Sequence, residues 1–399
     1  MAEAVTPAKR HGLLLFAVVL LDMIGFGIVI PILPFITPSL GGDEFDIALI
    51  IASYAICAGI VGPFWGRLSD RFGRKPILMF CTAGAAGGYL LLANADELWM
   101  IYAARVLAGL LAGNFPVASA MMADITPPNE RAKGMGLIGA AFGLGLVMGP
   151  VLGGLLAGSD GSFASPAMLA GGTSVFAAIA AGLFLPESRN PEIAQSKPSG
   201  LGLWQVLRAT QSRLLMLQYV FHTGSVAAIT YIFPLWVYAL LDWQAREVGI
   251  VFGVVGAVMA LNQGLLMGRL VGFFGELPLL RICVSLFFVG LAITLFADEA
   301  VLMVGSNLIA LTGATMCMPI LNAMVSRKAG AEERGRLMGA ASTAASIGRV
   351  VGPLAAGALL TAGGFTAAWS LPLLLVFGYL LWAFSHWAKR PTPEMRPAD

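Results

Sequence analysis

Asp22 is a carboxylate in the middle of a long apolar run, 13–36. A helix rises about 1.5 Å per residue, so Asp22 would lie about 13 Å along it, close to the middle of a bilayer core about 30 Å thick. A lone carboxylate there is costly when ionised. We therefore expect Asp22 to take up and release a proton as its access to either side of a membrane changes. The alternative is an Asp22 held permanently charged by Arg105 or Arg349.

Arg105 and Arg349 are the two basic side chains that fall inside apolar runs. We expect Arg105 to act with Asp22 in proton coupling, and we assign Phe26, His222 and Arg349 to a substrate cavity. One acid cannot neutralise two arginines, so the cavity would favour compounds with a carboxylate, a phosphate or another strong acceptor. Two structural alternatives stay open: Arg349 braces its span through helix-end carbonyls or water, and His222 is a packing residue.

A charged loop motif occupies residues 66–75. A tight turn between two antiparallel helices needs glycine, and a carboxylate at the end of the first helix can hold arginines of its own loop or the N-terminus of a helix in the other half of the molecule. The motif therefore predicts a latch at Asp70, with the gate residues Gly66, Asp70, Arg71, Gly73 and Arg74. The alternative is a basic loop that serves topology alone.

A second motif has the spacing G-x8-G-x3-G-P-x2-G-G and consists of Gly136, Gly145, Gly149, Pro150, Gly153 and Gly154. Three of these glycines recur at i, i+4 and i+8, which lets another helix backbone approach closely, while the proline loosens the helix. We expect a tight seal between the two halves of the molecule at this helix. Generic packing of small residues is the alternative.

The elements that must position these groups are membrane helices. Hydrophobic residues make up 58% of the 399 residues and charged residues 12%, against about 25% charged in soluble domains, which excludes a water-soluble globule. The sequence predicts twelve apolar spans, near 13–36, 47–65, 76–94, 98–121, 135–158, 166–185, 214–240, 247–267, 278–297, 300–324, 336–361 and 366–387. The fold class is therefore all-α integral membrane.

Charge placement sets the orientation. Twenty-one of the 24 Lys and Arg residues fall in the tails and in alternate loops on one side, whereas the opposite loops hold mainly acids. The positive-inside rule then predicts that both termini are cytoplasmic. The four cysteines lie in apolar runs and are expected to pack as free thiols, and the three histidines are too dispersed for a metal site.

An internal repeat divides the chain in two. At an offset of 203 residues, Pro116 aligns with Pro319 and Gly149-Pro150 aligns with Gly352-Pro353. The predicted organisation is an N-terminal six-helix bundle at 1–186, a cytoplasmic linker at 187–213 and a C-terminal six-helix bundle at 214–399, with a transport site between repeats. Chance matches of Gly-Pro pairs are the alternative.

The motifs resemble those of a known family. Residues 66–75 resemble the loop signature of the major facilitator superfamily, and the glycine spacing of span 5 resembles its antiporter signature. The run 21–27, followed by 31–34, looks like the first helix of the drug/proton antiporter branch, in particular its tetracycline-efflux-like group. The resemblance implies the major facilitator fold, twelve transmembrane helices in two six-helix bundles. Tetracycline exporters carry acids in their third and ninth helices, but 77–94 and 278–297 contain none, which argues against tetracycline itself.

The predicted function is proton-coupled antiport that exports small amphipathic compounds, drug-like molecules or organic anions, across the cytoplasmic membrane by alternating access. A proton-coupled symporter or a uniporter of a polar metabolite is the alternative. We expect no enzyme activity, cofactor, metal or nucleic-acid partner. The expected partners are a small-molecule substrate, protons and membrane lipid, and we expect a monomer in a bacterial inner membrane.

Overall fold

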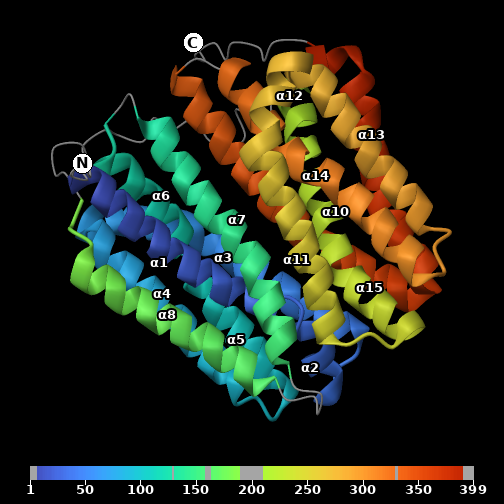
Figure 1. Ribbon diagram of the computed structural model, residues 1–399, viewed down its shortest axis with the longest axis horizontal. Helices are drawn as coiled ribbons and strands as arrows, with labels where there is room; N and C mark the ends of the chain where they lie inside the picture. Colours follow the sequence, from blue (N-terminus) through green and yellow to red (C-terminus); the bar gives the residue numbers. More distant parts are fainter. Residues whose placement is uncertain (1–6, 128–129, 158–162, 189–209, 329–330, 390–399) are drawn as a thin grey trace, which may run out of the picture. The chain divides into compact units, whose positions relative to one another are not determined.

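The computed structural model describes residues 7–127, 130–157, 163–188, 210–328 and 331–389, and they are almost entirely helical (Figure 1). The first half of the described chain forms α1 (Pro7–Val29), α2 (Leu33–Ser39), α3 (Glu44–Phe72), α4 (Arg74–Ala93), α5 (Leu98–Leu110), α6 (Asn114–Ile125), α7 (Arg131–Leu156) and α8 (Ala164–Phe184). The second half forms α10 (Thr210–Leu241), α11 (Ala245–Leu261), the π-helix η2 (Asn262–Leu266), α12 (Met267–Phe274), α13 (Glu276–Thr294), α14 (Ala300–Lys328), α15 (Ala331–Phe384) and the 3-10 helix η3 (His386–Lys389).

The described helices include eleven segments that are long and apolar enough to cross a membrane. One of them, within α15, runs over 48 residues, Leu337–Phe384, whereas about 20 residues suffice for one crossing. The backbone of α15 leaves helical geometry at Gly363 and Gly364, where the φ of Gly364 is +69°. This left-handed conformation favours glycine. The segment therefore holds the last two predicted spans, and the helices agree with the twelve-span fold.

Contacts group the chain into two units. The first unit comprises Met1–Lys197 together with Trp243–Gly256, and the second comprises Pro198–Asp242 together with Ala257–Asp399. The N-terminal part of α11 thus groups with the first unit. The halves 1–186 and 214–399, with the linker 187–213, stay a prediction from the repeat.

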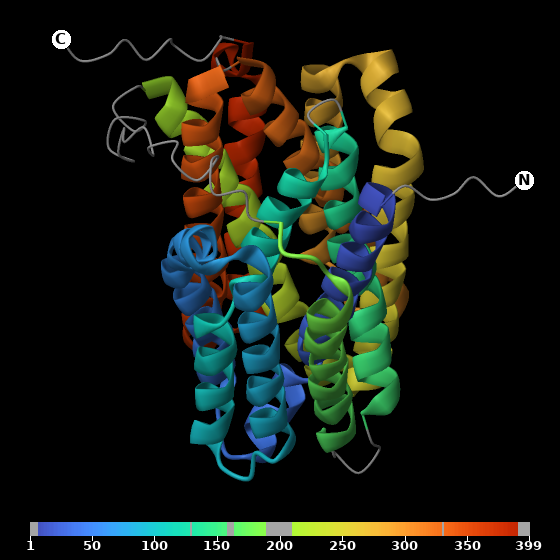
Figure 2. The same cartoon turned by 90° about the vertical axis from the view of Figure 1, so that its left-hand side faces the viewer.

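In the first unit, α1 lies against α7 and α8, and α4 packs on α8 and α5 (Figures 1 and 2). Two apolar cores hold these helices together, one around Leu15, Met121 and Ala177 and the other around Ile28, Tyr89 and Ala167. Because α1 contributes to both cores, Asp22 of α1 lies between two layers of buried apolar side chains.

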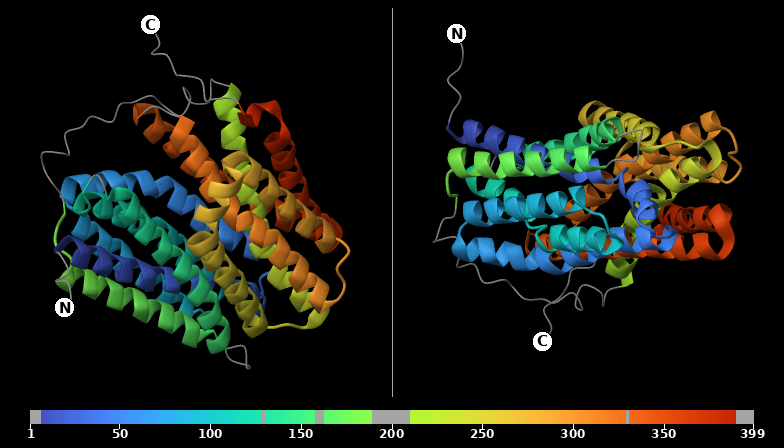
Figure 3. Two further views of the ribbon diagram at one scale, coloured as in Figure 1. Left: turned by 45° about the horizontal axis from the view of Figure 1, so that its top comes forward. Right: turned by 90° about the horizontal axis from the view of Figure 1, so that it is seen from below.

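In the second unit, α10 packs along α15, and α13 packs between α14 and α15 (Figure 3). A glycine contact of the first unit recurs here. Gly145 and Gly149 of α7 lie against Gly27 of α1, and their counterparts at the 203-residue offset, Gly348 and Gly352 of α15, lie against Gly224 of α10. Equivalent helices therefore make equivalent close contacts in the two repeats.

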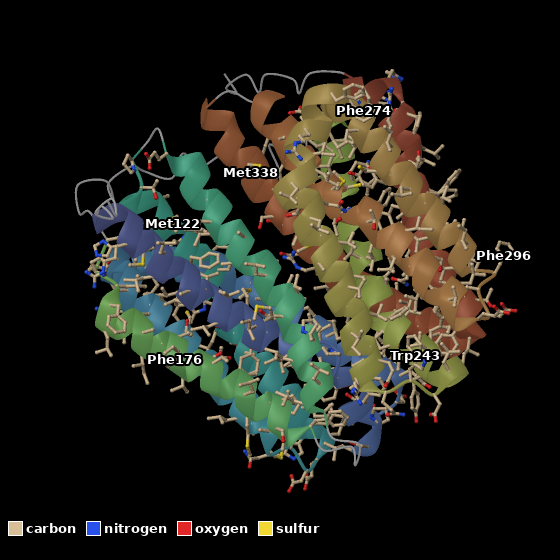
Figure 4. All side chains as sticks on the ribbon, viewed as in Figure 1. Met122, Phe176, Trp243, Phe274, Phe296 and Met338 are labelled. Carbon is tan, nitrogen blue, oxygen red and sulfur yellow. The ribbon has the colours of Figure 1, made fainter. Side chains whose placement is uncertain are left out.

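Large apolar side chains point away from the helices. Phe176 of α8 is 63% exposed and Phe296, which follows α13, is 81% exposed (Figure 4). Water would disfavour such a surface, whereas lipid tails accept it. The exposed apolar surface thus fits helices that face a bilayer.

Candidate functional site

The centre of the candidate site is a hydrogen bond between Asp22 and Asn114. The side chain of Asp22 is buried, and its Oδ2 accepts a hydrogen bond from Nδ2 of Asn114. Its other oxygen, Oδ1, has no hydrogen-bond donor among the described residues. A neutral amide can donate to the carboxylate without cancelling its charge.

A break between two helices positions Asn114. The fourth predicted span is interrupted at 111–113, so α5 ends at Leu110 and α6 begins with Asn114. Gly113 lies in the break, and a Cβ there would come within 2.7 Å of Sγ of Cys81. Only a glycine fits, because any larger residue would collide with Cys81 and the neighbouring Trp65. The break brings the first residue of α6 to the carboxylate on α1.

A small cavity adjoins the Asp22–Asn114 pair. Its volume is about 10 Å³, close to the space that one water molecule needs. Aromatic side chains from three helices form part of its wall: Phe26 of α1, Tyr54 of α3 and Tyr89 of α4. The rings of Phe26 and Tyr54 have centroids 5.2 Å apart. Asp22 therefore faces a wall that combines these aromatic rings with smaller apolar side chains.

Arg105 of α5 is the second buried charge in this unit, with 6% of its surface exposed. Its guanidinium carbon lies 4.4 Å from the ring centroid of Tyr54, in cation–π geometry. Its Nε has no hydrogen-bond acceptor among the described residues, and no ion pair joins it to Asp22 there. The face of the Tyr54 ring contacts Arg105, and the same side chain lines the cavity beside Asp22. Asp22 and Arg105, which the sequence suggested as an ion pair, thus both neighbour Tyr54.

The loop motif between α3 and α4 is organised around Arg74. Its guanidinium donates to Oδ1 of Asp70 at 2.6 Å, to Oδ2 of Asp124 at 3.1 Å and to Oγ of Ser69 at 2.7 Å. The Arg74 side chain is 14% exposed, whereas that of Asp70 is 53% exposed. The predicted partnership of Asp70 with an arginine of its own loop therefore occurs, with the arginine as the central residue.

Other residues of the motif have separate surroundings. Gly73 has a φ of +107°, which a residue with a side chain rarely adopts. Glu187, just after α8, accepts hydrogen bonds from the backbone N–H groups of Arg74 at 2.8 Å and Lys75 at 3.2 Å, and so caps the N-terminus of α4. Arg71 lies over the ring of Phe72, 5.3 Å from its centroid, and Gly66 has open space at its Cα.

The glycines of α7 divide between two neighbours. Gly145, Gly149 and Gly153 contact α1, where a Cβ on Gly149 would lie 2.5 Å from the Cα of Gly27. Gly154 contacts the N-terminal part of α11, at Ala245 and Gly249, inside the same unit. The close approach that the i, i+4, i+8 spacing predicts is present, but the stack packs on a helix of its own bundle.

Two other members of the glycine motif differ from that stack. A Cβ on Gly136 would meet no atom within 4 Å, and Pro150 carries the carbonyl that approaches Gly249 of α11. Gly136 therefore makes no close helix–helix contact among the described residues. The proline-bearing turn, in contrast, is part of the close contact.

The second unit holds the other predicted cavity residues. His222 of α10 is buried, with its ring 6.1 Å from that of Phe287 and 6.2 Å from that of Tyr379. Arg349 of α15, expected to be buried, is exposed on this unit taken by itself and donates to Oγ of Ser346 at 2.9 Å. His222 thus has the surroundings of a packing residue, and the cavity role of both residues stays a prediction.

Three residues of the site were not predicted from the sequence: Asn114, Tyr54 and Tyr89. Asn114 was detectable as an amide inside an apolar run, 98–121, where an unpaired polar group is costly. The two tyrosines were not, because aromatic residues are common in membrane helices and only the packing of α3 and α4 brings them beside Asp22.

Comparison with known proteins agrees with this architecture. The family model of the Major Facilitator Superfamily matches residues 15–271 and 215–398. The chain is 29% identical to the class H tetracycline resistance protein of Pasteurella multocida, over 93% of each chain. It is 30% identical to Multidrug resistance protein 1 of Bacillus subtilis (strain 168), over 84% of this chain and 86% of that protein.

Solved structures share the fold. A bacterial homologue of the human lysosomal transporter Spinster, in an inward-facing and unoccupied conformation, has a TM-score of 0.77 with 15% identity and covers 99% of this chain and 100% of its own. At this identity the likeness concerns the fold alone.

Proposed function

The chain belongs to the major facilitator superfamily, and we propose that it is a proton-coupled antiporter that exports small amphipathic compounds by alternating access. Near-complete alignment with tetracycline and multidrug resistance proteins supports this assignment. The observation that carries it is the buried Asp22–Asn114 pair, a titratable group in the interior of a membrane protein with one oxygen unsatisfied.

The pair supports a simple exchange. When Asp22 is ionised, the amide of Asn114 donates to it, and the remaining oxygen can accept a proton. When Asp22 is protonated, the carboxyl is neutral and the cost of a charge inside the bilayer disappears. In an antiporter, the ionised and the protonated protein must differ in their affinity for substrate or in the side of the membrane to which the cavity opens. Only such a difference can shift the equilibrium between conformations. Arg105, stacked on Tyr54, is a fixed positive charge that both states would sense.

The substrate class follows from the walls of the site and from the relatives. Phe26, Tyr54 and Tyr89 offer apolar faces, which suit the hydrophobic part of an amphipathic compound. The buried Arg105 adds a preference for a compound with an acceptor or an anionic group. We therefore propose drug-like molecules or organic anions as substrates.

The protein is an integral membrane protein, and we propose that it lies in a bacterial inner membrane with both termini in the cytoplasm. The relatives are bacterial resistance proteins, and the strong bias of Lys and Arg toward one set of loops supports the orientation. The loop motif around Arg74 would then lie on the cytoplasmic side. There, the Asp70–Arg74–Asp124 cluster could hold the cytoplasmic ends of α3, α4 and α6 together when the cavity faces outward.

Transport by purified protein in liposomes tests the function. An imposed pH gradient should drive exchange of a panel of anionic, cationic and neutral amphipathic compounds, tetracycline among them. Asp22→Asn keeps the size of the side chain but removes titration, so pH-driven exchange should fall to background while substrate-for-substrate exchange persists. Asp96→Asn, at an exposed carboxylate of the α4–α5 loop, is the matched control and should transport normally.

Three outcomes would overturn the proposal. Full pH-driven exchange by the Asp22→Asn variant would exclude Asp22 as the proton carrier. Substrate movement in the same direction as the proton would instead identify a symporter, and movement that ignores the pH gradient would identify a uniporter.

A further inference from the structure

The π-helix η2 interrupts the eighth predicted span within the second unit. It covers Asn262–Leu266, and the backbone N–H of Met267 bonds to the carbonyl of Asn262, five residues back. Short π-helices inside α-helices are rare and occur frequently at functional sites. In η2, two consecutive amide side chains, Asn262 and Gln263, both reach the same residue of α14, Thr315.

Thr315 has an unusual backbone because of Pro319. In an α-helix, the carbonyl of each residue accepts a hydrogen bond from the N–H four residues later, and proline has no N–H. Pro319 lies inside α14, so the carbonyl of Thr315 lacks its normal helical donor. Thr315 is half-buried, and a backbone carbonyl without a donor costs free energy in the membrane interior.

Gln263 supplies the missing donor. Its Nε2 donates to the carbonyl oxygen of Thr315 at 3.0 Å. Next to it, Nδ2 of Asn262 approaches Oγ1 of Thr315 at 3.5 Å, while that hydroxyl donates to the carbonyl of Thr312 at 3.0 Å. The Gln263 amide thus replaces the N–H that Pro319 lacks. It links η2 to α14 at the turn that has one helical hydrogen bond fewer.

A related contact occurs in the first unit. Pro116, the repeat counterpart of Pro319, follows the break between α5 and α6. There Nε1 of Trp65, in α3, donates to the carbonyl of Leu110 at 2.8 Å. In both repeats a side chain of the second span therefore donates to a backbone carbonyl of the fourth span, a few residues before the proline.

We propose that Gln263 is a positioning residue of the transport cycle, which keeps α14 continuous through Pro319 by standing in for the N–H that the proline lacks. While the bond is made, the parts of α14 before and after the proline are held at a fixed angle. When it breaks, α14 can bend at Thr315–Pro319. The role in transport rests on the proposed function, whereas the hydrogen bond that replaces the missing donor does not.

A double-mutant cycle tests the proposal in the full-length protein. Gln263→Met keeps the length of the side chain but cannot donate. Pro319→Ala restores the N–H, so the helix itself can satisfy the carbonyl of Thr315. With Pro319 in place, Gln263→Met should lower the apparent melting temperature and reduce the maximal rate of pH-driven exchange roughly 2- to 10-fold, with KM changed less than about 2-fold. When Gln263→Met is combined with Pro319→Ala, it should change neither quantity relative to Pro319→Ala alone.

Gln218→Met is the matched control in the same unit. The Gln218 amide donates to the carbonyl of Leu214 in its own helix, so the effect of this substitution should not depend on residue 319. Equal losses for Gln263→Met with and without Pro319→Ala, or no loss with Pro319 in place, would overturn the proposal. The melting temperatures need no substrate, so they decide the hydrogen bond even if no tested compound is transported. The role in the cycle would be overturned if Gln263→Met lowered the melting temperature only with Pro319 in place but reduced transport equally with and without Pro319→Ala.

Discussion

Asp22 has two oxygens in different surroundings, one bonded to a neutral amide and one without a donor among the described residues. An arginine in place of Asn114 would hold the carboxylate ionised, because the attraction between the two charges is lost when the acid is protonated. An apolar residue would leave the ionised form with no stabilising contact. The amide is intermediate, and that makes Asn114 the residue most able to set the pH at which the site works.

Replacing Asn114 should therefore move the pH profile. Asn114→Leu removes a donor that stabilises only the ionised carboxylate, so the proton should be released at higher pH. The pH of half-maximal driven exchange should rise by about one to two units, since a hydrogen bond to a charged group contributes about 1.5–3 kcal/mol. Asn94→Leu, at an amide that donates to Leu90 at the exposed end of α4, is the control. A profile that stays in place for Asn114→Leu would separate this amide from the proton site.

At the residue scale, the sequence could identify charges but not their partners. Asp22, Arg105 and Arg349 stand out because a charged side chain in an apolar run is expensive. Asn114 lies 92 positions from Asp22, and their contact depends on a helix break near Gly113 and on how α6 then packs against α1, which the sequence does not encode locally. The exposed position of Arg349 on its unit likewise depends on how α15 packs, which hydropathy does not encode.

The pairing of α1 with α7 relies on backbone contact, because the glycines of α7 bring the two helices together without side chains between them. Such an interface has no flexible group that could move aside. Whether a glycine of α7 can be replaced by alanine therefore depends on whether that position faces α1.

Two alanine substitutions in α7 should behave in opposite ways. Gly149→Ala places a Cβ about 2.5 Å from the Cα of Gly27 and should destabilise the protein by roughly 1–3 kcal/mol, seen as a lower apparent melting temperature. Gly136→Ala meets nothing within 4 Å and should stabilise the helix by roughly 0.5–1 kcal/mol. Equal effects of the two substitutions on stability would contradict the contact between α1 and α7.

The loop between α3 and α4 should depend more on Arg74 than on Asp70. Arg74→Gln removes the bonds to Asp70, Asp124 and Ser69 together, whereas Asp70→Asn removes one half-exposed partner, and exposed ion pairs contribute little. Arg74→Gln should lower the melting temperature by several degrees and raise labelling, from the cytoplasmic side, of cysteines placed at the ends of α3 and α6. Asp70→Asn should shift the labelling more weakly. A larger effect from Asp70→Asn would return the central role to the carboxylate.

At the scale of helices, the existence of the spans was predictable and their interruptions were not. A bilayer forces every backbone group into a helix, so long apolar runs determine the spans. The breaks at 111–113 and at η2 fall inside predicted spans and were not predicted, whereas the turn at Gly363–Gly364 falls between the predicted spans 336–361 and 366–387. Pro319, in contrast, lies within a continuous helix, and Gln263 donates to the carbonyl of Thr315 that the proline leaves without a helical donor.

The whole molecule consists of two units with related internal contacts, which agrees with the repeat found in the sequence. Gly149 and Gly352 are counterparts in the two repeats, and each lies against a glycine of the first helix of its repeat, Gly27 or Gly224. A parallel repeat of six spans requires an even number of crossings in each half, so the two ends of the chain should lie on the same side of the membrane.

Reporter fusions test this arrangement. Fusions at residues 44 and 298 should report the outside, and fusions at residues 73 and 275 should report the cytoplasm, where the basic loops are expected. Fusions at the two repeat-related positions, 73 and 275, serve as controls for each other. A cytoplasmic signal at residue 44 or 298 would reverse the orientation and move the Arg74 cluster to the outside.

The turn at Gly363–Gly364 bears on how the protein is made. The last two spans are joined within one 48-residue apolar segment whose turn, 361–366, carries no charged residue. During synthesis, no polar loop between the two spans would stay in water after the first span has entered the membrane and before the second one enters it. The two spans should therefore leave the translocation channel together as a helical hairpin, and a protease added outside intact cells should find almost nothing to cleave between them.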